Sequence, residues 1–215
     1  MLEAAVKSYE KAIEIEPKYA IVYNNLGIVF RELGQIHDSI NSYKKAIASQ
    51  PDFIEALNNL GNVLKEDGRL DDAIKFYEKA IVLKPDFADA YNNIGVVLFE
   101  MGQPGAIKFY EKALEIEPSY AEVHNNLGNT LKKIGQLDEA VKSYKAALKF
   151  EPDFVDAYNN LGVAFLGLRQ LDESVKSYRA TLKLEPDFAE AHNNLGMTLI
   201  ELGRLEEAEE SYRKA

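Results

Sequence analysis

Cysteine and tryptophan are both absent from the 215 residues of the chain. Without cysteine, the chain forms no disulfide bond and offers no thiolate to a catalytic or metal site. Basic residues are also few, because 25 Lys and Arg stand against 35 Asp and Glu and give a net charge of -10. A surface of this charge repels a phosphate backbone, so we expect no nucleic acid partner.

Long apolar runs are missing as well. No stretch of about 18 apolar residues, the length that crosses a bilayer, occurs in the sequence. Residues 1–11 mix Glu, Lys and Ala and lack the basic and then apolar order of a signal peptide. We therefore expect no membrane span and a cytoplasmic location. The apolar share of 47% is nonetheless enough for a folded core.

Two residue series recur along the chain with the same period. Prolines stand at positions 17, 51, 85, 118, 152 and 186, and Asn-Asn pairs begin at 24, 58, 92, 125, 159 and 193. Successive members of both series are 34, 34, 33, 34 and 34 residues apart. Since two unrelated residue types share even the one-residue deletion, the chain is a tandem array.

The unit from residue 52 to residue 85 predicts two helices. Apolar residues recur at helical spacing in both halves. They are Leu57, Leu60, Gly61 and Leu64, and then Ala73, Phe76, Tyr77, Ala80 and Ile81. Gly68 supplies a left-handed residue that ends the first helix, and Pro85 ends the second. Asp52 and Glu55 have the spacing of a capping box, so we expect Asp52 to cap the first helix.

The spacing of Leu60-Gly61, Leu64, Gly68, Ala73, Tyr77, Ala80 and Pro85 resembles the tetratricopeptide repeat. The resemblance implies an all-α fold, a right-handed α–α superhelix of antiparallel helix pairs. It makes residues 1–215 one solenoid, with a lone second helix at 2–16 and helix pairs at 19–50, 53–84, 87–117, 120–151, 154–185 and 188–215. The phrases YNNLG and PDFAEAHNNLG are most similar to the superhelical arm of O-linked N-acetylglucosamine transferases and to related bacterial repeat proteins.

Three departures from the repeat lead to further expectations. The chain starts midway through a repeat and stops at Ala215 without a polar end helix, so we expect it to be part of a longer protein. The stretch 102–106 is one residue short, and we expect Pro104 in the first turn of a shortened helix. Arg169 stands where the other repeats have glycine, so its turn is less favourable.

The second asparagine of each pair predicts a binding surface, because it points away from the apolar side of its own helix. The series consists of Asn25, Asn59, Asn93, Asn126, Asn160 and Asn194. In the repeat family this helix lines the concave groove, and in the transferase arm such a ladder holds the backbone of an extended peptide, so the resemblance implies the same here. The alternative is that these amides bond to a neighbouring helix. For the first asparagine of each pair, such as Asn58, a structural role is favoured.

Two neighbouring lines on the same helix face change in character along the chain. One contains Ile28, Asn62, Val96, Asn129, Val163 and Met197, and the other contains Arg31, Lys65, Phe99, Lys132, Leu166 and Ile200. Apolar residues gather toward the C-terminal end, and an exposed apolar strip often marks a contact surface. The predicted peptide-binding set therefore also includes Asn62, Asn129, Val96, Phe99, Val163, Leu166, Met197 and Ile200. The alternative is that the apolar strip packs against a helix outside this chain.

The sequence contains no pattern of residues that is typical of a catalytic or metal-binding site. His124 and His192 stand where other repeats have Tyr91 or Tyr158, so we expect them on the core side. No catalytic residue, metal ligand or cofactor is predicted. The sequence instead predicts a non-enzymatic scaffold that binds an extended peptide or a disordered protein segment. The alternatives are the substrate-presenting arm of a glycosyltransferase whose catalytic domain lies outside this chain, and a module that self-associates end to end.

Overall fold

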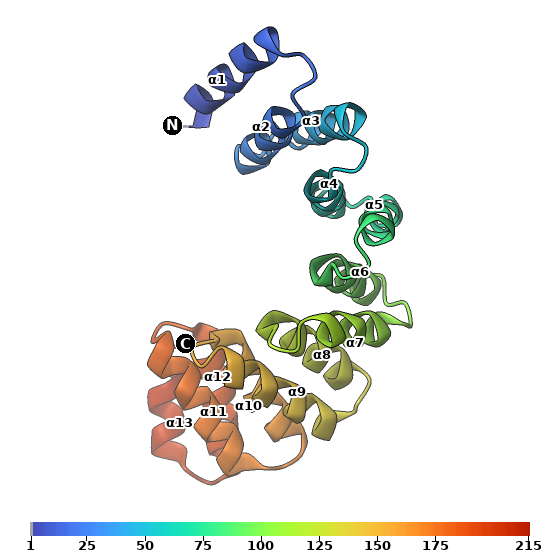
Figure 1. The fold of residues 1–215 in the computed structure, drawn as a ribbon. Helices are drawn as coiled ribbons and strands as arrows, with labels where there is room; N and C mark the ends of the chain where they lie inside the picture. The colour runs from blue at the N-terminus through green and yellow to red at the C-terminus, as the bar shows by residue number, and fades with distance from the viewer. Residues whose placement is uncertain (1) are drawn as a thin grey trace. The chain divides into compact units, whose positions relative to one another are not determined.

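The computed structural model describes residues 2–215, which contain thirteen α-helices and no β-strand (Figure 1). The prediction of an all-α fold is confirmed. In chain order the helices are α1 (Leu2–Ile15), α2 (Ala20–Glu32), α3 (Ile36–Ser49), α4 (Ile54–Glu66), α5 (Leu70–Leu83), α6 (Ala88–Glu100), α7 (Ala106–Ile116), α8 (Ala121–Lys133), α9 (Leu137–Phe150), α10 (Val155–Gly167), α11 (Leu171–Leu184), α12 (Ala189–Glu201) and α13 (Leu205–Tyr212). None of these helices is both long and apolar enough to cross a membrane.

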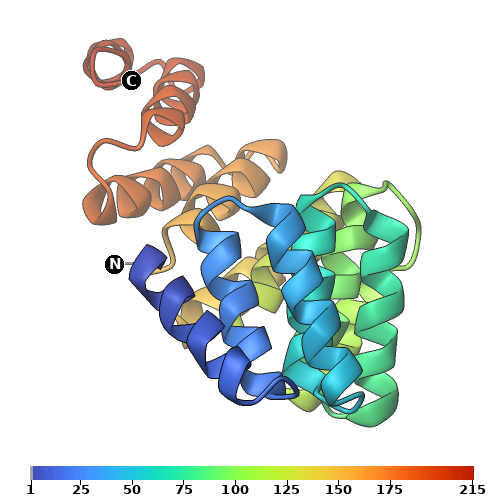
Figure 2. The same cartoon turned by 90° about the horizontal axis from the view of Figure 1, so that it is seen from above.

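The helices divide between two compact units, unit 1 (Met1–Phe109) and unit 2 (Tyr110–Ala215). Unit 1 contains α1, the packed pairs α2/α3 and α4/α5, and α6 (Figure 2). Unit 2 contains the packed pairs α8/α9, α10/α11 and α12/α13. α7 holds residues of both units. We call the even-numbered members of these pairs, together with α6, the first helices, and their odd-numbered partners the second helices.

The two helices of a pair approach closely at a glycine. A Cβ atom on Gly61 of α4 would lie less than 3.0 Å from the ring of Tyr77 on α5, so a larger residue does not fit. Tyr77 is fully buried. The same contact recurs as Gly27 with Tyr43, Gly128 with Tyr144, Gly162 with Tyr178 and Gly196 with Tyr212. In these five pairs, a glycine and a tyrosine therefore set the distance between the helices.

First helices contact the first helices of the next pair, whereas second helices do not contact one another. In unit 1, α4 contacts both α2 and α6, and in unit 2, α10 contacts both α8 and α12. Within the described residues, α3 makes no such contact with α5, nor does α9 with α11. In Figure 1, α2, α4 and α6 follow one edge of unit 1, and α3 and α5 follow the other. Since the first helices lie closer together, each unit curves toward the side of its first helices.

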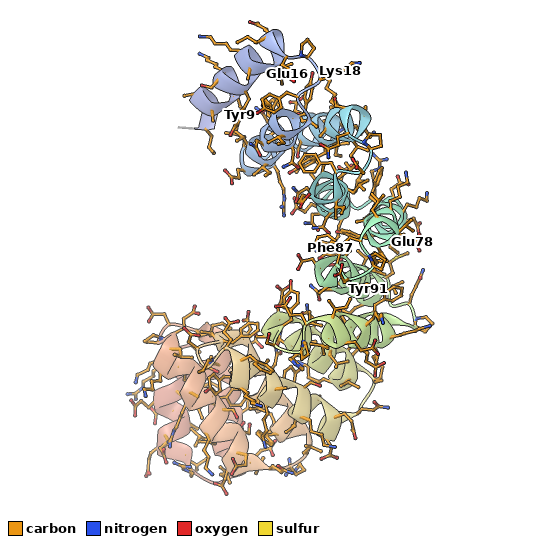
Figure 3. The ribbon with its side chains drawn as sticks, viewed as in Figure 1. Tyr9, Glu16, Lys18, Glu78, Phe87 and Tyr91 are labelled. Atoms are coloured by element: carbon orange, nitrogen blue, oxygen red, sulfur yellow. The ribbon has the colours of Figure 1, made fainter. Side chains whose placement is uncertain are left out.

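Aromatic residues, and not the predicted acids, stand at the N-termini of the first helices. The N-cap residue of α4 is Phe53, with φ -78°, ψ 90° and no side-chain capping bond. The corresponding residues are Tyr19, Phe87, Tyr120, Phe154 and Phe188. Phe53 and Phe87 pack against buried residues of unit 1, and Figure 3 shows Phe87 at the start of α6 beside Tyr91. The expectation that Asp52 caps α4 is wrong, because packing of the aromatic side chain sets where the helix begins.

Residues with positive φ end the first helices. Gly68, which follows the C-cap residue Asp67 of α4, has the expected positive φ of 76°, and Arg169 takes the same conformation with φ 61°. The shortened turn before α7 contains two such residues, Gly102 with φ 65° and Gly105 with φ 113°. Because Gly105 is not helical, α7 begins only at Ala106. The expectation that Pro104 lies in the first turn of this helix is therefore wrong.

Candidate peptide-binding surface

The second asparagines all lie on first helices with partly buried side chains. They are Asn25 on α2, Asn59 on α4 and Asn93 on α6 in unit 1, and Asn126 on α8, Asn160 on α10 and Asn194 on α12 in unit 2. Four of the first asparagines lie deeper, since Asn24, Asn92, Asn125 and Asn159 are at most 7% exposed, whereas Asn58 is partly buried and Asn193 is exposed. In those four pairs, the two adjacent asparagines therefore meet different environments.

In unit 1, the second asparagine of one repeat bonds to the first asparagine of the repeat before it. Nδ2 of Asn59 donates to Oδ1 of Asn24 at 3.1 Å, and Nδ2 of Asn93 donates to Oδ1 of Asn58 at 3.0 Å. The first of these bonds satisfies an acceptor on a buried side chain. One N–H of Asn59 and one of Asn93 are thus structural, as the alternative interpretation of the series expects.

Unit 2 repeats this bridge and adds a lysine to it. Nδ2 of Asn160 donates to Oδ1 of Asn125 at 3.3 Å, and Nζ of Lys132 donates to Oδ1 of Asn160 at 3.0 Å. Nζ of Lys132 also lies 6.0 Å from the centre of the Tyr144 ring. Burial lowers the pKa of the Lys132 ammonium group, and the nearby charge of Glu190 opposes this with a smaller effect.

Asn62 and Asn129 are oriented by a tyrosine of the same helix pair. The hydroxyl of Tyr77 donates to Oδ1 of Asn62 at 2.8 Å, and the hydroxyl of Tyr144 donates to Oδ1 of Asn129 at 2.8 Å. Burial raises the pKa of both tyrosines, so their hydroxyls keep the protons that they donate. In each asparagine, Oδ1 therefore accepts a hydrogen bond from the tyrosine, and the Nδ2 group does not face that hydroxyl.

These bonds leave a defined set of amide atoms unused on the first helices. Asn59 and Asn93 each keep an oxygen and one N–H, and Asn62 and Asn129 keep both N–H groups, without a further hydrogen bond to residues 2–215. Asn59 and Asn62 are three residues apart on α4, so their side chains are neighbours on the helix surface. Together they offer an acceptor and a donor, which is what one unit of peptide main chain requires.

The bridge is not formed between α10 and α12. Nδ2 of Asn159 donates instead to Oε1 of Glu190 at 3.1 Å, and Oδ1 of Asn159 is buried without a hydrogen-bond partner in the described chain. The side-chain amide of Asn194 makes no hydrogen bond to residues 2–215, and the same holds for Asn25 on α2. Both the oxygen and the NH2 group of these two side-chain amides are consequently unused by residues 2–215.

Apolar members of the predicted set are partly or largely exposed. Val96 and Phe99 on α6 are partly buried, as are Val163 and Leu166 on α10. The next residues in these lines, Met197 and Ile200 on α12, are 47% and 49% exposed. The apolar strip expected toward the C-terminal end is thus present in unit 2, on the same helices as Asn160 and Asn194.

An ion pair that the repeat pattern does not predict joins α2 and α4. Nε of Arg31 lies 2.9 Å from each carboxylate oxygen of Glu66, so the cation is already neutralised within unit 1. The two residues are 35 positions apart, which is also the separation of Asn24 and Asn59. Complementary side chains at that separation are thus the signal in the sequence that both contacts share.

Two of the three histidines have structural contacts. Nε2 of His124 lies 2.9 Å from the carbonyl oxygen of Pro118, and its ring stacks on Phe150 at 5.7 Å. Nε2 of His192 makes the matching contact with the carbonyl of Pro186 at 2.8 Å. Within residues 2–215, no group of three or more His, Cys, Asp or Glu side chains is arranged to hold a metal ion.

Comparison with protein families identifies the class of the chain. The TPR repeat family matches residues 2–30, 27–68, 61–102 and 128–168, and related tetratricopeptide repeat families match residues 88–120, 109–142 and 164–215. The chain therefore belongs to the tetratricopeptide repeat family. These matches support the family as a whole and not specifically the glycosyltransferase arm.

Solved structures with the same fold include several repeat proteins. A crystal structure of MamA is 30% identical, with a TM-score of 0.67, over 77% of this chain and 97% of that chain. YrrB is 24% identical, with a TM-score of 0.64, over 86% of this chain and 96% of that chain. The Cut9–Hcn1 hetero-tetramer of APC/C is 17% identical, with a TM-score of 0.81, over 100% of this chain and 42% of that chain, and its likeness extends to the fold alone. A comparison with curated proteins gives no match.

Proposed function

We propose that the chain is a protein-interaction scaffold that binds an extended peptide or a disordered protein segment along its first helices. The observation that carries this proposal is the set of half-used amides, in which one atom is held by the fold and the others remain for a ligand. Asn59 and Asn62 are the best defined pair. YrrB, which shares the fold, is described as a TPR protein with an unusual peptide-binding site, although at 24% identity its likeness shows the fold alone.

The amides suit main-chain atoms more than any particular side chain. A net gain of about 1 kcal/mol for each hydrogen bond, opposed by the cost of ordering the peptide, gives weak and sequence-tolerant binding. Apolar neighbours supply contact area for aliphatic side chains of the ligand. These neighbours are Val96 and Phe99 in unit 1, and Val163, Leu166, Met197 and Ile200 in unit 2.

The test uses a substitution that changes the atoms offered to the peptide and keeps the acceptor of the Tyr77 hydroxyl. Asn62→Asp retains an oxygen for the hydroxyl of Tyr77 and replaces the unused NH2 group by an acceptor. Asn41→Asp is the matched control, because it adds the same charge to an exposed residue of α3. The probe is a ten-residue peptide of threonine, valine and glutamine with both ends blocked, titrated into the labelled chain and followed by backbone amide chemical shifts.

We expect saturable shifts for the native chain and for Asn41→Asp, with binding at least about 3-fold weaker for Asn62→Asp, the loss of part of one hydrogen bond. The melting temperatures of the three proteins should agree. Equal affinities would remove Asn62 from the site. A native chain that shows no saturable shift with this probe would overturn the proposed function.

The substrate-presenting arm of a glycosyltransferase is the second candidate. It is favoured by the repeated NNLG phrases, whose second asparagines lie on the first helices with unused amide atoms. The catalytic domain would then belong to another part of the protein. Transfer of N-acetylglucosamine by the full-length protein to a peptide that residues 2–215 retain would support this role, and a full-length protein without such activity would exclude it.

Self-association is the third candidate and involves the end of unit 2. Leu205 and Tyr212 on α13 are 64% and 38% exposed, and with Ile200 they line a shallow pocket of about 430 Å³. Covering apolar surface contributes roughly 25 cal/mol per Å², which favours contact with a second copy. Sedimentation of the native chain and of Leu205→Glu across a range of concentrations tests this. Association that Leu205→Glu abolishes supports the role, and monomers in both cases exclude it.

A further inference from the structure

A groove of about 810 Å³ opens between two second helices of unit 1, α3 and α5. Both helices contact α4 but not each other, so the space between them is left open. We call it the α3/α5 groove. None of the asparagines of the candidate peptide-binding surface lines it. Its lining consists of Ile47, Pro51, Leu57, Phe76, Val82 and Leu83, with Asp72, Lys75, Glu78 and Lys79.

The groove contains a departure from the repeat at Leu57. In the other repeats, the residue at this position carries a ring, as Tyr23, Tyr91, His124, Tyr158 and His192. The corresponding groove of unit 2, between α11 and α13, is lined by His192 and Pro186, so the ring of this position lies in the groove. The α3/α5 groove has the matching proline, Pro51, and lacks the ring.

The ring at this position also donates a hydrogen bond. The hydroxyl of Tyr23 donates to the carbonyl oxygen of Pro17 at 3.3 Å, six residues earlier in the chain. His124 and His192 make the same contact through Nε2 with the proline six residues before them. Leucine has no donor, and the carbonyl oxygen of Pro51 accepts no hydrogen bond from residues 2–215. The α3/α5 groove is therefore without the ring and without the donor at its end.

Phe76 does not replace the missing ring. Most second helices have serine at its position, so an exchange of volume with Leu57 is the simplest alternative. The next helix pair argues against that exchange, because it combines Phe109 at the position of Phe76 with Tyr91 at the position of Leu57. The centres of those two rings are 6.5 Å apart. A phenylalanine at this position is thus compatible with a second ring beside it.

The rim of the groove is apolar where the following repeats are charged. Val82 on α5 is 80% exposed, and Glu115, Lys149 and Lys183 stand at its position in the next three repeats. Exposed apolar residues beside an apolar groove are typical of a contact surface. Two acids and two lysines also line the groove, so its charges balance and do not select a charged ligand.

We propose that the α3/α5 groove binds the side chain of a tyrosine from a partner protein, with the ring beside Phe76 and the hydroxyl donating to the carbonyl oxygen of Pro51. Tyrosine has the chemistry of the missing group, an apolar ring with a neutral donor at its end. It is also the residue that three other repeats have at the position of Leu57. The groove shares no residue with the candidate peptide-binding surface, so this inference does not depend on the proposed function.

The experiment titrates three blocked pentapeptides of glycine and serine, whose central residue is tyrosine, phenylalanine or alanine, into the chain. Methyl chemical shifts of Val82 and Leu83 report on the groove. Leu57→Tyr supplies the ring and the donor from within, as Tyr23 does in its own repeat. His124→Tyr is the matched control, because it introduces a tyrosine at the same repeat position, where a ring is already present.

We expect saturable shifts with the tyrosine peptide for the native chain and for His124→Tyr. The phenylalanine peptide should bind at least about 3-fold more weakly, by the loss of one hydrogen bond, and the alanine peptide should not bind. Leu57→Tyr should abolish the shifts and keep the native melting temperature. Equal affinities for tyrosine and phenylalanine, binding by Leu57→Tyr as by the native chain, or a native chain without saturable shifts would each overturn the inference.

A second variant keeps Leu57 and changes the rim. Val82→Lys introduces the residue that two other repeats have at this position, and it should weaken binding of the tyrosine peptide at least about 2-fold, because apolar contact area is lost. An unchanged affinity would contradict the proposed site. Shifts of Leu83 that grow with the concentration of the native chain, without any peptide, would mean that a second copy occupies the groove. That result would overturn the assignment to a separate partner.

Discussion

Asn59 on α4 donates an amide hydrogen to Asn24 on α2, at 3.1 Å and across 35 positions of the sequence. The bond joins two consecutive repeats through side chains that the repeat places at the same two positions every time. It holds the amide of Asn59 in one orientation while its oxygen and second N–H remain unused by residues 2–215. A single side chain thus joins two repeats and keeps polar atoms for the proposed ligand.

Loss of this bond should be measurable as a decrease in the free energy of unfolding. Asn59→Ala should lower the free energy of unfolding by about 1–2 kcal/mol, because it leaves the buried oxygen of Asn24 unsatisfied. Asn25→Ala is the matched control, since the amide of Asn25 makes no hydrogen bond to residues 2–215, and it should change stability by less than about 0.5 kcal/mol. Denaturant unfolding compares the two. Equal losses would mean that the bridge contributes nothing of its own.

The helices and their order can be predicted from the sequence, because each repeat contains residues that end helices. Gly68 and the prolines mark helix ends, and the close contact of Gly61 with Tyr77 underlies the small-to-large pattern. The starts of the first helices do not follow in the same way. Asp52 has the chemistry of a cap, but burying the aromatic ring of Phe53 outweighs one exposed hydrogen bond.

For the candidate site, the sequence predicts only which residues share a face of a helix. Helical geometry shows that Asn59 and Asn62 share a face, but it does not show which of their atoms are already bonded. That depends on the hydroxyl of Tyr77 and the oxygen of Asn24, which are brought close by packing between and within repeats. The ion pair of Arg31 with Glu66 has the same origin.

A buried hydroxyl in unit 2 should respond to a designed partner. Tyr178 is fully buried and its hydroxyl has no hydrogen-bond partner in the described chain. Val163 stands at the position where Asn129 accepts from Tyr144 in the preceding pair. Val163→Asn should therefore raise the free energy of unfolding by about 1 kcal/mol.

The reverse exchange is the matched control. Asn129→Val removes the acceptor of Tyr144 and leaves a buried hydroxyl unsatisfied, which should cost about 1–2 kcal/mol. Chemical unfolding of both variants beside the native chain gives the two values. The explanation fails if Val163→Asn destabilises the chain or if Asn129→Val has no effect.

Arg169 should be replaceable with a gain in stability. Its φ of 61° lies in the left-handed region, which costs a residue with a Cβ atom about 1 kcal/mol relative to glycine. Arg169 also pairs with Glu201, but both side chains are exposed, so the pair contributes little. Arg169→Gly should thus raise the free energy of unfolding by about 0.5–1 kcal/mol. Arg169→Ala, which loses the pair and keeps the Cβ atom, is the control and should bring no gain.

Lys132 should titrate below the ordinary range of lysine. Burial lowers its pKa from the usual 10.5, because the charged form loses hydration that its bond to the neutral oxygen of Asn160 does not fully replace. The folded chain then binds this proton less tightly than the unfolded chain does, so Lys132 lowers the free energy of unfolding at neutral pH. That loss is recovered as the pH rises through the lowered pKa toward 10.5.

Reductive methylation with a carbon-13 label makes each lysine visible in a pH titration by NMR, and the signal absent from Lys132→Met assigns the residue. We expect its midpoint below 10.5, because burial disfavours the charged form. A midpoint at or above 10.5 in the unliganded chain would mean that water reaches the ammonium group freely. Lys132 would then behave as an ordinary surface lysine.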